Sequence, residues 1–189
     1  MGMLTPGADP VRKVSIIPRG QALGVTFSAP DADRFNFDER HLLAQIKVAL
    51  GGRVAEEVVF GDLTTGAESD IQQLTRIARH MVGRWGMSRT IGPVAVLPAD
   101  GGSALFPGVS ETSEQTQRLV DEEVRRIIDT AHEEAIEALT EHRSNLDSLA
   151  AALLERETLD QADAYESAGL PQNTEAVPEE ATPVSVPDS

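Results

Sequence analysis

Three long stretches of this 189-residue chain repeat apolar residues at intervals of three and four. That interval places the apolar residues on one face of an α-helix, so each stretch predicts a helix that must bury one side. The stretches cover residues 38–61, 71–85 and about 111–142. Asn36 or Asp38 can cap the first helix, and Gly61 follows its end. Helices with one apolar side each predict a core shared between helices.

The rest of the sequence predicts only short strands and short helices. Residues 11–17 and 22–27 are short, β-branched and bounded by Pro18, Gly20 and Pro30, which is typical of strands. Two further short helices are expected around 146–157 and 160–168. The sequence therefore predicts a mainly α fold with a small β element near the N-terminus.

Two local features of the predicted helices carry packing expectations. Gly51 and Gly52 lie in the middle of the first helix, where close approach of another helix is the simplest explanation. In the third helix, Asp121 is four residues before Arg125 and Glu122 is four before Arg126. We expect these charges to pair along the solvent-exposed face.

Charge and composition exclude several classes of protein. The chain has 31 acidic and 16 basic residues, a net charge of -15, which argues against binding nucleic acid or an anionic membrane surface. No run of 18 apolar residues is present, so no membrane-spanning helix is predicted. The absence of cysteine excludes disulfides, thiol nucleophiles and cysteine-ligated zinc.

The last 19 residues differ in composition from the rest. Residues 171–189 contain four prolines, four acidic residues and no basic residue. Such a segment buries too little apolar surface to offset its ordering entropy. We expect a folded domain over residues 1–170 and a disordered, acidic, proline-rich tail over residues 171–189.

The sequence lacks most of the motifs that mark a phosphate-binding, nucleophilic or zinc site. The chain has no GxxxxGK[ST] or GxGxxG phosphate-binding motif and no GxSxG nucleophile turn. No two of its four histidines have the i,i+4 spacing of a helical zinc site, so we expect each to be solvated or at the core edge. Glu68 and Asp70 open the second helix after the turn Thr64–Thr65–Gly66. Spacing alone assigns them no more than a favourable interaction with the helix dipole.

Several motifs are nevertheless specific in their order and spacing. They are VRKVSIIPRG at 11–20, ALGVT at 22–26, GGRVAEE at 51–57, TTGAESD at 64–70 and WGMS at 85–88. Together they resemble the proteolytic domain of FtsH-type ATP-dependent zinc metalloproteases, and the resemblance covers about residues 2–170. It implies a helical metallopeptidase domain that hydrolyses peptide bonds with one zinc ion.

The resemblance also implies roles for particular residues. Family members take two histidine ligands and a glutamate general base from a HEAGH segment, and the third ligand, an aspartate in the TTGAxxD motif, corresponds to Asp70. Glu56 and Glu57 would orient or tune the ligands. The extended run containing Leu23, Gly24, Val25 and Thr26 resembles the edge strand that holds substrate beside the cleft.

The sequence departs from the family pattern at its start. In family members the HEAGH segment directly precedes a stretch resembling residues 2–10, and this sequence begins after that segment. We expect a peptidase domain truncated within its active-site helix, with no catalytic residue of its own, no stoichiometric zinc and no activity in isolation. Two alternatives stay open: a non-catalytic helical module (a pseudo-peptidase) that joins or regulates a complete relative, and an independent enzyme that pairs Asp70 with Glu56 or Glu57.

Further expectations concern the whole protein of which such a domain is part. The resemblance implies ATP use through an ATPase module absent from this sequence, unfolded or membrane polypeptides as substrates, a homohexamer, and a place at the cytoplasmic face of a membrane. This chain itself is expected to be soluble, without contact to membrane or nucleic acid.

Overall fold

The computed structural model describes residues 1–18, 24–29, 36–97 and 112–172. Within these ranges it contains five α-helices, a 3-10 helix and three strands. Their bounds are β1 (Val11–Ser15), β2 (Val25–Ser28), α1 (Glu39–Phe60), η1 (Thr65–Ala67), α2 (Glu68–Gly83), α3 (Glu114–Glu141), α4 (Arg143–Arg156), β3 (Thr158–Asp160) and α5 (Gln161–Ala168). The predicted mainly α fold with a small β element near the N-terminus is confirmed. The predicted tail falls on residues that, beyond Gln172, lie outside the described ranges.

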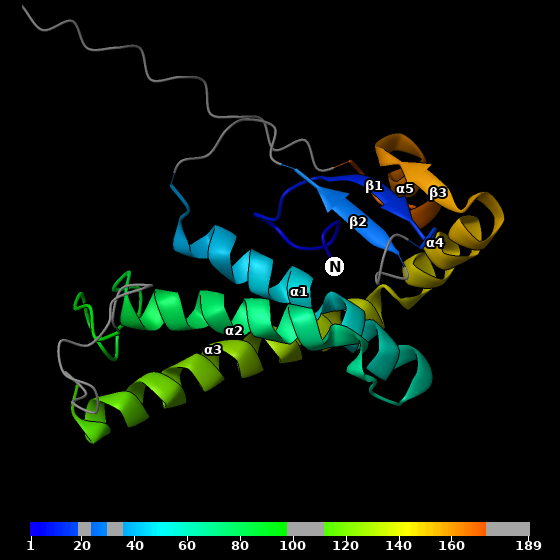
Figure 1. The fold of residues 1–189 in the computed structure, drawn as a ribbon. Helices are drawn as coiled ribbons and strands as arrows, with labels where there is room; N and C mark the ends of the chain where they lie inside the picture. The colour runs from blue at the N-terminus through cyan, green and yellow to red at the C-terminus, as the bar shows by residue number, and fades with distance from the viewer. Residues whose placement is uncertain (19–23, 30–35, 98–111, 173–189) are drawn as a thin grey trace, which may run out of the picture.

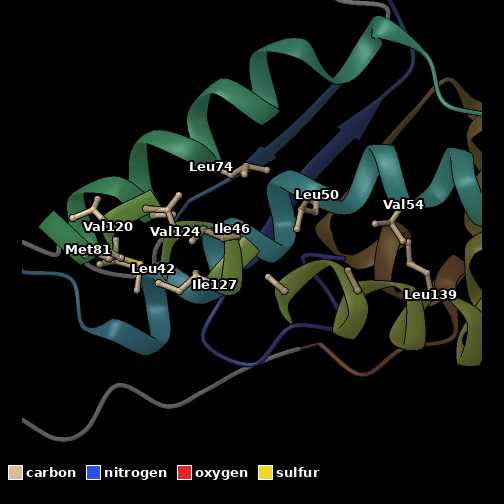
Figure 2. Packing of buried hydrophobic residues seen from close by; sticks show 14 residues of the cluster. Leu42, Ile46, Leu50, Val54, Leu74, Met81, Val120, Val124, Ile127 and Leu139 are labelled. Carbon is tan, nitrogen blue, oxygen red and sulfur yellow. The ribbon is translucent and has the colours of Figure 1, made fainter. Parts of the chain in front are cut away.

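Helices α1, α2 and α3 pack side by side and enclose the main core, while the sheet, α4 and α5 form the other end of the molecule (Figure 1). The core between the three helices is aliphatic, as Figure 2 shows. Ile46, Val54 and Val82 are completely buried. Each such side chain contributes about 1.5–3 kcal/mol on removal from water, so this core is the main source of stability.

The ends of α1 follow the local sequence. The Asp38 side chain accepts a hydrogen bond of 2.7 Å from the backbone N–H of His41, which satisfies a free donor of the first turn. Gly61 ends the helix in the left-handed conformation, with φ of 70°. Both caps are as predicted.

Two packing expectations for α1 are corrected. Among the described residues, no other helix approaches Gly51 or Gly52. A Cβ at Gly51 would lie 2.7 Å from Cγ of Met1, so the N-terminal segment packs there, and a Cβ at Gly52 would meet nothing within 4 Å. His41 is buried, with 2% of its surface exposed, although we predicted a solvated or core-edge residue. Its Nδ1 donates to the carbonyl of Gly7 at 2.9 Å, and its Nε2 accepts from the Gln45 amide at 3.0 Å. These two hydrogen bonds make its burial tolerable.

The sheet has one strand more than predicted. The strand order is β2-β1-β3, and both pairings are antiparallel. β3 lies between α4 and α5, where Leu159 pairs with Val14 of β1 and packs in a second small core with Leu153 and Ala164. Its three residues are too few to show alternation, so the pattern did not reveal this strand. The sheet therefore joins the beginning of the domain to its last helices.

None of the helices in the described ranges is both long enough and apolar enough to cross a membrane.

Candidate functional site

Asp70 lies in the first turn of α2, on the side of the helix that faces the core. It precedes Leu74 by four residues, and Leu74, Ala78 and Met81 are the buried stripe of this helix. The side chain is half-buried. Burial raises the pKa of the Asp70 carboxyl above its ordinary value. In the described part of the chain its carboxylate takes part in no hydrogen bond or ion pair. No described side chain thus compensates the desolvation of this group.

Glu56 fixes the turn that leads into α2. Its carboxylate accepts hydrogen bonds from the Thr64 hydroxyl at 3.0 Å and from the Thr64 backbone N–H at 3.3 Å. The same hydroxyl accepts from the N–H of Gly66 at 3.2 Å. The side chain at the end of α1 therefore orders the TTG turn, and through it the first turn of the helix that carries Asp70.

Glu57 makes a different contact. Its Oε2 lies 3.2 Å from Nε2 of His132, so this pair links α1 to α3. His132 is partly exposed, which agrees with a residue at the edge of the core. Neither this pair nor the Glu56 contacts involve Asp70, and the structure gives each glutamate a packing role beside any role at a metal.

The described residues do not assemble a complete metal centre on their own. Among them, no group of three or more histidine, aspartate or glutamate side chains is arranged to hold a metal ion. Asp70 can supply one oxygen donor, but a catalytic zinc site has three protein ligands and a water. The fit of zinc to these residues is therefore partial, and further ligands are required.

The predicted substrate strand corresponds to β2. This strand lies at the edge of the sheet, and Val25, Thr26, Phe27 and Ser28 are all exposed. A Cβ at Gly24 would lie 2.8 Å from the carbonyl oxygen of Ser15, so β2 can approach β1 this closely only with glycine there. Leu23 lies outside the described residues. The geometry offers a strand edge to which an extended peptide can add.

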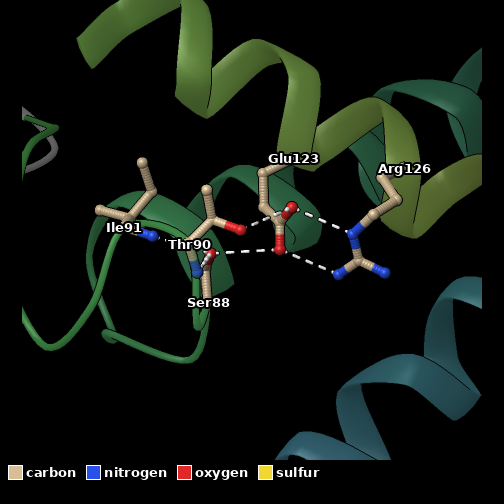
Figure 3. Close-up of polar contacts among 5 residues, drawn as sticks. All are labelled: Ser88, Thr90, Ile91, Glu123 and Arg126. Carbon is tan, nitrogen blue, oxygen red and sulfur yellow. Dashed lines mark hydrogen bonds and ion pairs between the residues drawn. The ribbon is translucent and has the colours of Figure 1, made fainter.

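A polar cluster after α2 was missed by the sequence reasoning (Figure 3). Glu123 of α3 is buried, and it accepts hydrogen bonds from the hydroxyls of Ser88 at 3.2 Å and Thr90 at 3.3 Å. Arg126 binds both of its oxygens, through Nε at 3.0 Å and Nη2 at 2.9 Å. Ser88 also accepts from the N–H groups of Thr90 and Ile91. The cluster fastens the loop after α2 to α3.

The hydrogen bonds from Arg126 are the main reason that the pKa of Glu123 lies below its ordinary value. Burial of Glu123 opposes this lowering, and the hydrogen bonds from Ser88 and Thr90 add to it.

Other ion pairs replace the i,i+4 pairs that the sequence predicted along α3. Arg126 binds Glu123 rather than Glu122, and Asp121 faces Arg79 of α2. The sequence did contain one indication of this cluster. Glu123 stands between Val120 and Ile127 on the apolar stripe of α3, where a buried charge needs a partner.

The domain thus combines a mainly α fold with an ordered turn before Asp70 and an exposed sheet edge. The profile of Peptidase family M41 matches residues 1–166, and the chain belongs to this family.

Curated relatives agree with this assignment. The ATP-dependent zinc metalloprotease FtsH 3 of Conexibacter woesei is 78% identical over 170 residues, which is 90% of this chain and 23% of the relative. The ATP-dependent zinc metalloprotease FtsH of Thermobaculum terrenum is 51% identical over 90% of this chain and 27% of its own length. The ATP-dependent zinc metalloprotease FtsH of Syntrophus aciditrophicus is 48% identical over 90% of this chain and 24% of its own length. The chain thus spans about a quarter of the length of these relatives.

Proposed function

We propose that this chain is the peptidase domain of an ATP-dependent zinc metalloendopeptidase and that Asp70 is one of the protein ligands of its zinc ion. The observation that carries the proposal is the state of Asp70: a half-buried carboxylate whose pKa is raised by burial and which no described residue compensates. Groups perturbed in this way are concentrated at functional sites. Family membership supports the same assignment.

The remaining ligands and the general base would come from a HEAGH segment before residue 2. Met1 lies against Gly51 of α1, so residues joined to Met1 would enter beside the helix that orders the turn before Asp70. A bound zinc ion supplies Lewis acidity and lowers the pKa of a coordinated water. The chain's own part is to hold Asp70 in place, with Glu56 fixing the TTG turn and Glu57 bracing α1 against α3.

Substrate would bind as an added strand. The outer edge of β2 presents unpaired backbone groups in the described sheet, which suits an extended polypeptide and gives affinity without strict sequence preference. Gly24, Val25 and Thr26 would form this edge. The substrates we propose are polypeptides, including unfolded and membrane proteins.

The properties of the whole protein are proposed from the family and from the names of the relatives, which are ATP-dependent zinc metalloproteases. We propose use of ATP by a separate ATPase module, assembly as a homohexamer, and action at the cytoplasmic face of a membrane. This chain alone is proposed to be inactive, because one carboxylate cannot hold catalytic zinc.

The ligand assignment is tested in a chain extended by a helix carrying HEAGH in frame with Gly2. Asp70→Ala should abolish both zinc retention and casein hydrolysis. Glu68→Ala, which removes an exposed carboxylate from the same helical turn, should preserve both. Glu57→Ala should lower zinc affinity by about 10–100-fold if it orients a ligand. Full zinc retention in Asp70→Ala would place the third ligand elsewhere, with Glu56 and Glu57 the next candidates.

The unextended chain gives a second test. Calorimetric titration with zinc should show no 1:1 site tighter than about micromolar, because a lone carboxylate cannot supply the roughly 8 kcal/mol that this affinity requires. A stoichiometric site of that affinity would contradict the proposal that HEAGH residues complete the centre.

A further inference from the structure

The first nine residues connect the two ends of the molecule. In the described ranges the strands pack with one another and with α4 and α5, and none of them packs extensively against α1, α2 or α3. Residues 1–9, which we call the N-terminal joint, lie between α1 and the sheet (Figure 1). Met1 and Leu4 of the joint pack against the main core, whereas Met3 packs against the second small core. The joint therefore contacts both the three-helix core and the part of the molecule that carries β2.

The buried side chain of His41 holds the joint on α1. Its Nδ1 donates to the carbonyl of Gly7 at 2.9 Å, and its Nε2 lies 4.0 Å from Oδ2 of Asp9. The ring of Phe37 stacks on the His41 ring, with 5.1 Å between centroids and 14° between planes. Gly7 and Asp9 precede β1, and Phe37 follows β2. One side chain in the first turn of α1 thus contacts the chain both before and after the β1–β2 pair.

The joint is compact, so that a bond at one residue fixes its position. The Thr5 hydroxyl, which is buried, donates to the carbonyl of Met1 at 3.1 Å, and the N–H of Ala8 donates to the carbonyl of Thr5 at 3.2 Å. Gly7 has φ of 83°, and a Cβ there would lie 3.3 Å from Cγ of Arg40. The joint can therefore pass this close to the start of α1 because residue 7 is glycine.

We propose that His41 is a positioning residue: by holding the N-terminal joint on α1, it fixes the β2 edge relative to the helices that carry Asp70. This role rests on the proposed function, in which a peptide on β2 is presented to the site of Asp70. Such presentation requires a fixed geometry, because a misplacement of about 1 Å can cost about 100-fold in rate. His41 acts through the joint and touches no substrate.

Spin labels can measure this geometry in the full chain, which contains no cysteine of its own. Cysteines introduced at the exposed residues Ser28 of β2 and Gln73 of α2 carry the labels, and double electron–electron resonance gives the distribution of distances between them. His41→Leu keeps a buried apolar side chain but loses the donor to Gly7, so the distribution should broaden by about twofold. His41→Asn can place an amide N–H near the position of Nδ1 and should restore most of the narrow distribution.

Two controls separate positioning from general stability. Val120→Ala removes buried apolar volume from the main core and should lower the melting temperature without broadening the Ser28–Gln73 distribution. A second label pair, at the exposed residues Gln73 of α2 and Arg125 of α3, should give the same distribution in the parent chain and in both His41 variants.

The consequence for hydrolysis is measured in the chain extended by HEAGH. With a flexible peptide as substrate, His41→Leu should lower kcat by about tenfold and change KM by less than about twofold, because the β2 edge still binds the peptide but presents it poorly. Zinc retention should be unchanged, and His41→Asn should recover most of the lost kcat.

An unchanged Ser28–Gln73 distribution in His41→Leu would overturn the proposal. Equal broadening in Val120→Ala would show general loosening, and equal broadening in His41→Asn would show that the hydrogen bond to Gly7 does not hold the joint; either result would also overturn it. If the extended parent chain neither retains zinc nor cleaves the peptide, the proposed function fails, whereas the spin-label distances still decide whether His41 fixes the joint.

Discussion

Two carboxylates lie near opposite ends of α2 and have opposite surroundings. Asp70 belongs to the first turn of α2, whereas Glu123 belongs to α3 and binds the loop that follows α2. Near the end of the helix, Glu123 receives donors from Ser88, Thr90 and Arg126, and its pKa lies below the ordinary value. At the start, Asp70 is half-buried with no compensating donor in the described residues, and its pKa is raised. A carboxylate surrounded by donors holds the fold together, whereas one that is desolvated without donors opposes folding. The second kind is retained where function requires it.

The two carboxylates should respond to pH with opposite signs. Because the pKa of Glu123 is lowered on folding, its contribution is present above the ordinary carboxyl pKa and is lost as pH falls through the folded value. Because the pKa of Asp70 is raised on folding, the folded state binds the Asp70 proton more tightly than the unfolded state does. At pH above the raised pKa, the charge on Asp70 therefore destabilises the fold.

The largest expected effect is at Glu123. Glu123→Gln keeps the shape but loses the charge-assisted hydrogen bonds to Arg126, so the free energy of unfolding at neutral pH should fall by about 2 kcal/mol. Denaturant unfolding measures this loss. The difference from the parent chain should shrink as pH falls below the ordinary carboxyl pKa of 4.5.

Glu122→Gln is the matched control, since it removes an exposed carboxylate one residue away on α3. Its free energy of unfolding should stay within about 0.5 kcal/mol of the parent. Equal losses in the two variants would mean that the Glu123 cluster does not hold the α2–α3 loop.

A smaller effect of opposite sign is expected at Asp70. Asp70→Asn removes an uncompensated charge, so the chain should become more stable at neutral pH, by less than about 1 kcal/mol because the side chain is partly solvated. The gain should vanish below the ordinary carboxyl pKa of 3.8, where the Asp70 carboxyl is protonated in both states.

Thermal unfolding across this pH range measures the Asp70 gain, and Glu68→Gln in the same helical turn should show no such rise. Destabilisation by Asp70→Asn at neutral pH would show that its carboxylate has a stabilising partner, and the contrast with Glu123 would fail.

The smallest expected effect comes from the tail. Deleting residues 171–189 should change the melting temperature by less than about one degree, because a segment of this composition contributes little buried apolar area. Both pH responses should persist in the shortened chain. A drop of several degrees, or the loss of either response, would show that the tail docks on the domain.

The sequence by itself determined much of this protein. Apolar residues at helical intervals predicted α1, α2 and α3, because burial of one face is a local property of the repeat. Asp38 and Gly61 marked the ends of α1, since caps use neighbouring backbone groups. The GGRVAEE, TTGAESD and WGMS motifs identified the family, and Asp70 was singled out through them.

Only the tertiary structure decided which distant residues meet. β3 was hidden because three residues carry no period, and it forms only by pairing with β1 across the whole domain. Arg126 pairs with Glu123 rather than with Glu122, because Glu123 is buried and its charge would be costly to leave unpaired. The raised pKa of Asp70 likewise arises from packing: desolvation depends on which surfaces fold together, and spacing along one chain does not specify that.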